Sequence, residues 1–172
     1  MPRGKTKRVF ILIDGSNFYH RLKEPEIGLT NLLQFNFNEF AKWLTRGNKI
    51  VRKNYYIGVV RAKPNQIKAQ RLRRNQQRLF AKLKKQNWEI FRGFIMKTGR
   101  DFHEKGVDVK IATDLIVGAY EDTYDTAVLV SSDLDLIPAI DKAKELGKEI
   151  EYIGFGHKPS FGLQAHAIDK QL

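Results

Sequence analysis

The chain has 172 residues and a mass of 19.9 kDa, and 42% of its residues are hydrophobic and 29% charged. This size and composition fit one globular domain, and they exclude a fibrous chain and a wholly disordered one. Cysteine is absent and the formal net charge is +12, so disulfides, thiolate zinc sites and cysteine nucleophiles are excluded and a polyanionic partner is favoured.

Strand and helix patterns alternate along the chain. The β-branched and aromatic run at residues 8–13 predicts a buried strand that ends in the turn pair Asp14–Gly15. Further strands are expected at residues 50–60, 88–95, 126–131 and 149–154. Helices are expected at residues 36–46, 65–85, 107–120 and 134–146, followed by a short one at 163–170. In the helix at 65–85, Asn65 is the predicted N-cap and the predicted inward residues are Ile67, Leu72, Leu79, Phe80 and Leu83.

The nearly all-apolar strands predict a parallel sheet that is covered by helices on both faces. We expect a single domain over residues 1–172, with a core at about 8–155, a basic N-terminal tail at 1–7 and a C-terminal segment at 156–172. No apolar run reaches the roughly 18 residues that span a bilayer. The first residues, MPRGKTKR, lack the apolar stretch of a secretory signal, so a cytoplasmic location is expected.

Three aspartates follow the ends of two predicted strands. Asp14 ends the first strand in IDGSN, and Asp133 and Asp135 follow the fourth strand in VSSDLDL. Asp108 lies in the first turn of the preceding helix, where a negative charge is favoured. Because the carboxyl ends of central parallel strands converge on the ligand site, we expect these carboxylates to share one small volume. Such a cluster needs a cation, and hard oxygen ligands select Mg²⁺ or Mn²⁺, which predicts a divalent metal site.

Each acid also has a purely structural interpretation. Asp14 could satisfy amides of the loop that follows it, and Asp133 could cap the next helix. Asp108 could interact only with the helix dipole, and Asp114 could be a solvated helix residue. Within the Asp133–Asp135 pair, Asp135 is the weaker candidate, because helical positions i and i+2 point apart.

Short polar side chains lie beside these acids and could support them. Ser131 and Ser132 could orient a ligand, a metal-bound water or a phosphate, or they could form only the turn between strand and helix. Asn17 could hold Asp14 or reach a phosphate through its amide, or it could form only an Asx turn.

Basic residues are concentrated in the middle third of the chain. Residues 41–99 contain 17 Lys and Arg and a single acid, Glu89, whereas the rest of the chain contains 14 basic and 18 acidic residues. A nucleic acid is favoured over a membrane because this segment has no continuous apolar face, although a solvated surface is the simpler alternative. The best docking candidate is the helix at 65–85. The predicted RNA-binding residues are Arg61, Lys63, Lys68, Arg71, Arg74, Arg78 and Lys82.

Three segments occur in order over residues 8–155: IDGSNFY, KGVDVKIATDL and VLVSSDLDLIPAIDKAKELGKEIEYIG. Together they resemble the NYN domain family, in its LabA-like branch, which is related to the PIN-domain nucleases. The resemblance implies a PIN-like three-layer α/β/α sandwich with a mostly parallel central sheet of about five strands. The residues that match the family's catalytic, metal-binding cluster are Asp14, Asp108, Asp133 and Asp135, and further motif positions are matched by Asn17 and Asp114.

The function that the resemblance implies is a metal-dependent ribonuclease. Mg²⁺ or Mn²⁺ would be the cofactor, and single-stranded or structured RNA the partner, with no membrane involved. A non-catalytic RNA-binding or scaffold module is the main alternative. A metal-dependent phosphatase for small substrates would leave the basic helix unexplained. The sequence leaves a homo-oligomer open and identifies no protein partner.

Overall fold

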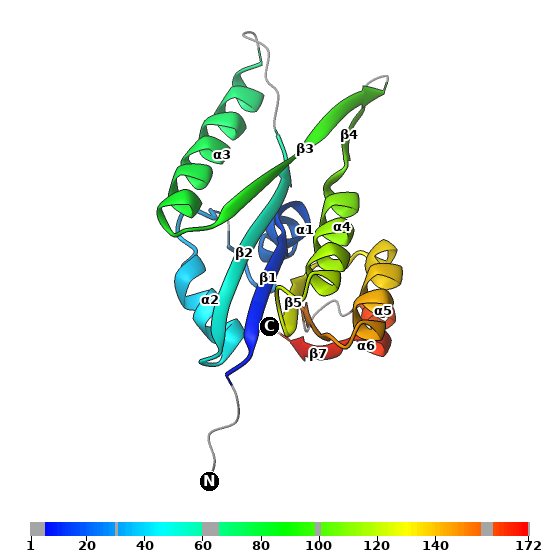
Figure 1. Ribbon diagram of the computed structural model, residues 1–172. Coiled ribbons are helices and arrows are strands. Elements are labelled where there is room, and N and C mark those ends of the chain that lie inside the picture. The colour runs from blue at the N-terminus through cyan, green and yellow to red at the C-terminus, as the bar shows by residue number, and fades with distance from the viewer. Residues whose placement is uncertain (1–5, 30, 60–65, 99–100, 156–159, 172) are drawn as a thin grey trace.

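The computed structural model describes residues 6–29, 31–59, 66–98, 101–155 and 160–171 (Figure 1). The strands are β1 (Arg8–Asp14), β2 (Lys49–Gly58), β3 (Glu89–Thr98), β4 (Asp101–Lys105), β5 (Thr126–Val130), β6 (Glu149–Gly154) and β7 (Ile168–Gln171). The helices are α1 (Gly15–Leu22), α2 (Phe37–Thr45), α3 (Ile67–Lys85), α4 (Val107–Tyr120), the 3₁₀ helix η1 (Leu134–Leu136), α5 (Ile137–Glu145) and α6 (Phe161–His166).

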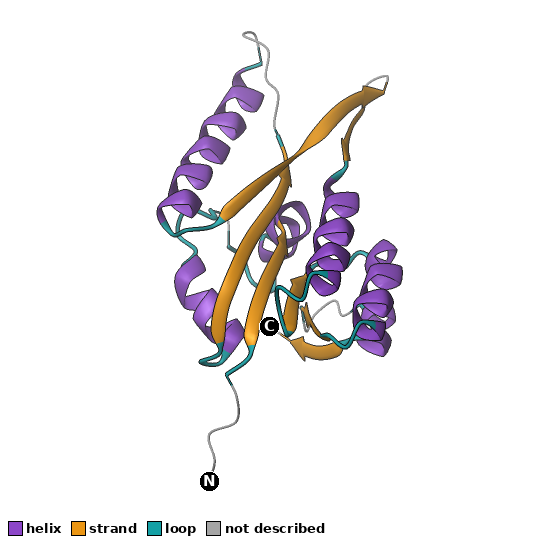
Figure 2. Cartoon of the chain, viewed as in Figure 1, coloured by secondary structure: helices purple, strands orange, loops and turns teal. Residues whose placement is uncertain are grey.

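The strands form one sheet in the order β4-β3-β2-β1-β5-β6-β7 (Figure 2). Every described pair of neighbouring strands is parallel except β3 and β4, which form an antiparallel hairpin. The chain moves from β1 to β2 on one side and later returns to β5 on the other, so the topological switch point lies between β1 and β5. This is the place where sheets of this kind bind ligands.

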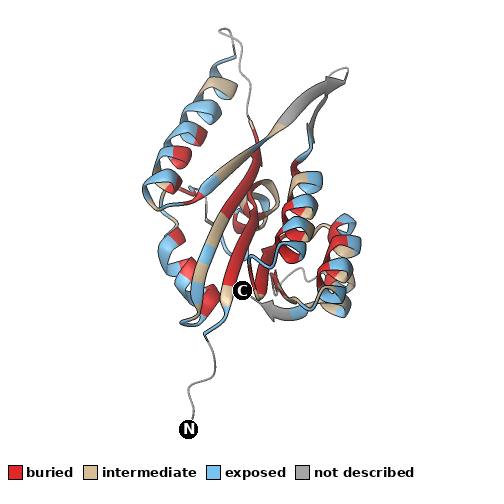
Figure 3. Ribbon diagram, in the orientation of Figure 1, coloured by how far each residue is buried: buried red, intermediate tan, exposed pale blue. Residues whose placement is uncertain are grey.

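Helices cover both faces of the sheet, as the sequence predicts. Ile11 and Ile13 of β1 belong to the core under α1, α2 and α3, whereas Phe10 and Leu12 belong to the core under α4, α5 and α6. This alternation explains why β1 is apolar from Val9 to Ile13, because both of its faces are buried (Figure 3). The predicted three-layer α/β/α fold with a mostly parallel sheet is confirmed.

The five predicted strands correspond to β1, β2, β3, β5 and β6, and the sheet gains β4 and β7 at its two edges. The helix α1 was not predicted, since the pair Asp14–Gly15 indicates a turn. The predicted helix at residues 163–170 differs from the structure, in which α6 ends at His166 and β7 follows. β7 reads IDKQ and pairs with β6 at the edge of the sheet, so a polar edge strand replaces the end of the expected helix.

Only the C-terminal half of α3 packs on the sheet. Leu79, Phe80 and Leu83 are buried as predicted, but Ile67 is 80% exposed and Leu72 is 45% exposed. The inward assignment of Ile67 is wrong, because the helix extends past the edge of the core over its first turns (Figure 3). Leu72 does face inward, towards Ile57 and Leu79, but it lines a pocket and so stays partly exposed. Its N-cap residue is Gln66, and the predicted cap, Asn65, lies outside the described residues.

Candidate active site at the carboxyl edge of the sheet

Asp14 is the last residue of β1 and the N-cap of α1. Its side chain is almost buried, with the residue 5% exposed. Asp14 Oδ1 accepts a hydrogen bond from the backbone amide of Asn17 at 3.0 Å, and Oδ2 accepts one from Ser131 Oγ at 3.1 Å. The carboxylate therefore does satisfy a loop amide, and the same contacts fix it at the carboxyl edge of the central strand.

Ser131 connects the ends of β1 and β5. Its buried hydroxyl, which donates to Asp14, also accepts from the backbone amide of Asp133 at 3.2 Å. Asp133 in turn caps η1, with Oδ1 accepting from the backbone amide of Asp135 at 2.9 Å. A single hydroxyl thus lies between Asp14 and the start of the Asp133 turn, at the switch point between two adjacent parallel strands.

A second set of contacts ties the same turn to α1. Ser132 Oγ donates to Asn17 Oδ1 at 2.9 Å and accepts from Arg21 Nη2 at 3.2 Å. Arg21 also pairs with Glu24 at 3.2 Å. Arg21 places a cation beside the acidic edge, and the sequence does not indicate it, because the pair Asp14–Gly15 predicts a turn where α1 begins.

The remaining acids of the predicted cluster are placed differently. Asp108 lies in the first turn of α4, and both Asp108 and Asp135 are exposed. Within the described ranges, no three Asp, Glu or His side chains come together as a metal-binding group. Ser131 connects the Asp14 carboxylate to the backbone amide of Asp133 at the ends of the two strands.

Asp114 belongs to a separate, internal network between α4 and β2. It is only 6% exposed, so its interpretation as a solvated residue is wrong. Its carboxylate accepts from Tyr56 Oη at 2.8 Å, Lys110 Nζ at 2.6 Å and Asn54 Nδ2 at 3.4 Å. Burial raises the pKa of the Tyr56 phenol, and the Asp114 carboxylate raises it further. The Tyr56 hydroxyl therefore stays protonated and donates to Asp114. Through these contacts Asp114 joins α4 to β2.

The backbone at Gly15 lies too close to the Tyr55 ring to leave room for a side chain. A Cβ atom at this position would lie 2.4 Å from a ring carbon of Tyr55, which is fully buried. The Tyr55 hydroxyl donates to the Gly15 carbonyl at 3.4 Å. The glycine therefore lets α1 begin directly above β2, immediately after Asp14.

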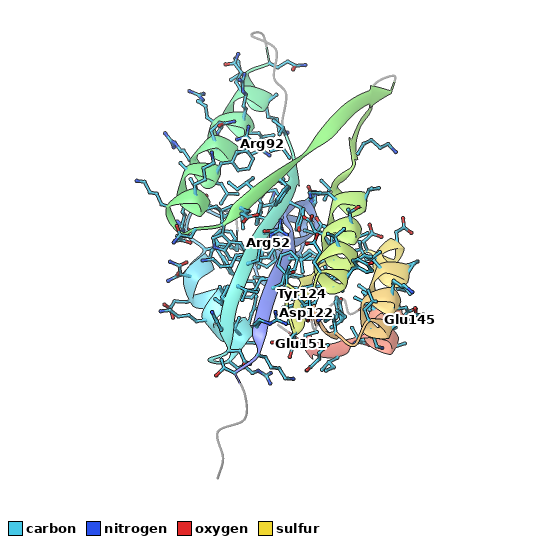
Figure 4. All side chains as sticks on the ribbon, viewed as in Figure 1. Arg52, Arg92, Asp122, Tyr124, Glu145 and Glu151 are labelled. Atoms are coloured by element: carbon cyan, nitrogen blue, oxygen red, sulfur yellow. The ribbon has the colours of Figure 1, made fainter. Side chains whose placement is uncertain are left out.

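The outer surface of α3 is basic, and long side chains extend from it into solvent (Figure 4). We use the name "basic surface of α3" for its exposed cations, which are Lys68, Arg71, Arg73, Arg74, Arg78, Lys84 and Lys85. None of them forms an ion pair with another described residue. The predicted contacts Arg61 and Lys63 lie outside the described residues.

Lys82 is on the same helix but is engaged inside the protein. Its ammonium donates to the carbonyl oxygens of Leu33 and Phe35 at 2.8 and 2.7 Å, and lies 6.0 Å from the centre of the Phe37 ring. Its charge therefore stabilises the segment between α1 and α2.

Comparison with known proteins agrees with this architecture. A solved structure of a protein of unknown function from Vibrio parahaemolyticus matches 98% of this chain and 94% of its own, with a TM-score of 0.72 and 20% sequence identity. No curated protein matches the sequence. No helix among the described residues is both long and apolar enough to cross a membrane. Residues 8–169 match the NYN domain, so the chain belongs to the NYN domain family, a nuclease-like, RNA-related family of the PIN-like superfamily.

Proposed function

We propose that this protein is a metal-dependent ribonuclease that hydrolyses phosphodiester bonds at the carboxyl edge of the sheet. The observation that carries the proposal is the Ser131 hydroxyl, which donates to the Asp14 carboxylate at the end of β1 and accepts from the backbone amide of Asp133 after β5. Two acids that lie 119 positions apart in the sequence are thereby placed at the switch point of the sheet. The LabA-like branch and a cytoplasmic location remain predictions from the sequence.

The residues at this edge fit a hard divalent cation. Asp14 and Asp133 supply carboxylate oxygens: Asp14 accepts from a backbone amide and a hydroxyl, and Asp133 accepts from a backbone amide. Mg²⁺ is commonly held by one or two protein carboxylates, with water and substrate phosphate completing its coordination. Asp14 and Asp133 would hold the ion, and Asp108 and Asp135 are the further carboxylates of the motif.

The ion, when bound, lowers the pKa of coordinated water and polarises the scissile phosphate. Asp14 is held rigidly for this role by Asn17 and Ser131. The guanidinium of Arg21, fixed on Ser132, is placed to bind a phosphate oxygen. In the hydrolysis, a water oxygen bonds to phosphorus, the bond from phosphorus to O3′ breaks, and O3′ takes up a proton. The products are a 5′-phosphate and a 3′-hydroxyl.

The basic surface of α3 supports RNA as the substrate class. Its cations have no acidic partners among the described residues, whereas Arg8, Lys110 and Lys148 elsewhere are ion-paired. A surface with unneutralised Arg and Lys attracts a phosphate backbone and offsets the repulsion between that backbone and the acidic edge.

A non-catalytic RNA-binding module is the second candidate function. It is favoured by one observation, that the described acids do not form a group of three or more around a metal position. In such a module Asp14 and Asp133 would act only as the caps of α1 and η1.

The test measures cleavage and binding of fluorescent single-stranded and hairpin RNAs, with Mg²⁺, with Mn²⁺ and with chelator. For the ribonuclease we expect metal-stimulated cleavage by the parent protein. In Asp133→Asn and in Asp14→Asn the cleavage rate should fall at least about tenfold, which is the effect of losing on the order of one transition-state contact. Both variants should keep RNA binding. The matched control is Glu121→Gln, an exposed acid with no ion pair among the described residues. RNA binding without metal-stimulated cleavage in the parent would establish the non-catalytic module instead.

A further inference from the structure

A pocket of about 290 Å³ opens beside the proposed cleavage site, on the side of the sheet that α1 and α3 cover. Its lining includes Gly15, Tyr19, Leu32, Ile57, Asn75 and Leu79. Gly15 directly follows Asp14, whose side chain belongs to the opposite face of β1. The Asp14–Gly15 peptide therefore separates the acidic edge from the pocket.

The pocket combines an apolar floor with polar groups at its mouth. Leu32, Ile57 and Leu79 are buried and form the floor. The amide of Asn75 and the imidazole of His20 are exposed at the mouth, and neither makes a hydrogen bond to another described residue. The half-buried ring of Tyr19 lies beside them. A flat apolar ring system with donors and acceptors on its edge matches this lining, and a nucleobase has that chemistry.

The position of the pocket fits one occupant. Asn75 lies between Arg74 and Arg78 in the sequence of α3, and Gly15 of the same lining directly follows Asp14, so the pocket borders both the basic surface of α3 and the acidic edge. Gln76 donates to the Gly58 carbonyl at 2.8 Å, which fixes this turn of α3 to the end of β2. A strand with phosphates on α3 and at the acidic edge would hold a base over the pocket mouth.

We propose that this pocket binds one nucleobase of single-stranded RNA next to the cleaved phosphate. The inference rests on the proposed function for the location of that phosphate. Contacts to phosphates carry no sequence information, whereas a pocket that contacts the base edge does. The pocket is therefore the part of the protein that gives cleavage a preference among bases and for unpaired over paired RNA.

The experiment uses single-stranded hexanucleotides in chelator, so that binding is measured without cleavage. Each of six oligonucleotides carries one abasic residue, at a different position. At one of the six positions, the abasic residue should weaken the affinity of the parent protein for the oligonucleotide by between about fivefold and about a hundredfold, as the loss of one stacked base does. The variant Tyr19→Leu/Asn75→Ala should reduce that effect to less than about twofold, by removing the stacking ring and the edge-reading amide.

The matched control is Gln77→Ala, which changes an exposed amide on the same helix outside the pocket lining. It should leave the positional effect intact. Equal affinity for all six oligonucleotides, or an unchanged effect in a folded double variant, would overturn the inference. A parent that shows the positional effect but never cleaves RNA would overturn the nuclease and leave the pocket assignment standing. A parent that cleaves RNA without any positional effect would overturn the pocket assignment and leave the nuclease standing.

Discussion

The ammonium of Lys82 has two carbonyl partners, Leu33 and Phe35, in the segment that leads from α1 to α2. Hydrogen bonds from a charged donor contribute more to stability than neutral ones do, about 1.5–3 kcal/mol. We expect Lys82→Met, which keeps the aliphatic stem, to lower the free energy of unfolding by about 1–3 kcal/mol. Urea denaturation measures this loss.

The same variant separates a structural cation from an RNA-binding one. RNA binding by Lys82→Met should keep the salt dependence of the parent, because this charge already faces two carbonyl groups. The comparison is Lys84→Met, an exposed cation on the same helix, which should flatten the salt dependence and leave stability unchanged. A flattened slope in Lys82→Met with parental stability would contradict the structural role.

Asp125 and Arg8 join the loop before β5 to the start of β1. Arg8 bonds to the Asp125 carboxylate through its guanidinium at 2.7 Å and through its backbone amide at 2.7 Å. The side-chain hydrogen bond from Arg8, and then the backbone one, lower the pKa of Asp125 from 3.8 to about 2. Asp122, which is labelled in Figure 4, also pairs with Arg8 at 3.0 Å.

Because the folded state lowers this pKa, the pair stabilises the protein above pH 3.8 and loses its effect as the pH falls towards about 2. We expect Asp125→Asn to lower the Tm at neutral pH by an amount that shrinks to nothing across that range. Thermal melts in steps from pH 7 to about pH 2 check this. Glu121→Gln is the matched control, and a Tm difference that persisted at the acid end would contradict the assignment.

Among the helices and strands that the structure describes, α3 is the one whose charge is least neutralised, because its exposed cations have no ion pair with a described residue. Each phosphate contact to a single strand adds about 0.7 to the slope of log affinity against log salt. We expect Arg71→Gln/Arg74→Gln/Arg78→Gln to reduce that slope by up to about 2 and to weaken binding most at low salt. Titrations of a labelled single-stranded RNA at four salt concentrations measure it.

The control for α3 removes the same charge elsewhere. Lys49, Lys142 and Lys144 are exposed outside α3, and their joint substitution by Gln should leave most of the parental slope. Equal slopes in the two triple variants would show that RNA responds to net charge alone and that α3 is not the docking surface.

Elements with a strong apolar period were predictable from the sequence, and elements defined by distant contacts were not. The helix predicted at 107–120 has those bounds as α4, because Val107, Ile111 and Leu115 recur every four residues and are buried. The helix α1 is short and begins inside a turn signal, and it is held by the contact of its first residue with Tyr55. β7 is short and polar and pairs with β6 at the edge of the sheet, a contact that its own sequence does not indicate.

The same distinction applies to the candidate site. The placement of Asp14 and Asp133 together follows from parallel strands whose carboxyl ends meet, which the apolar runs before both residues indicate. The burial of Asp114 could not be predicted, because its partner Tyr56 lies 58 positions away on β2. Arg21 and the pocket beside Gly15 depend on α1, so they became visible only in the structure.

For the whole molecule, the uneven charge of the sequence becomes a spatial separation. The basic segment, residues 41–99, contributes most of α2 and all of β2, α3 and β3, which form one side of the sheet (Figure 1). The rest of the chain, with 14 basic and 18 acidic residues, supplies β1, β5 and the acidic edge between them. In the proposed ribonuclease, the RNA backbone would therefore be attracted at one place and cleaved at another.

This separation predicts that substrate length changes the response to salt. α3 has 19 residues and so a length of about 28 Å, which a dinucleotide at the acidic edge does not cover but a twelve-residue strand does. We expect kcat/KM for the long strand to fall steeply with salt, by about 0.7 log units per log unit for each cation engaged. The short substrate should respond weakly, because it reaches Asp14 without the basic surface of α3. Initial rates for both substrates, at fixed Mg²⁺ and several salt concentrations, measure the two slopes. Parallel slopes would mean that attraction and cleavage occur at one site, against the separation that the fold displays.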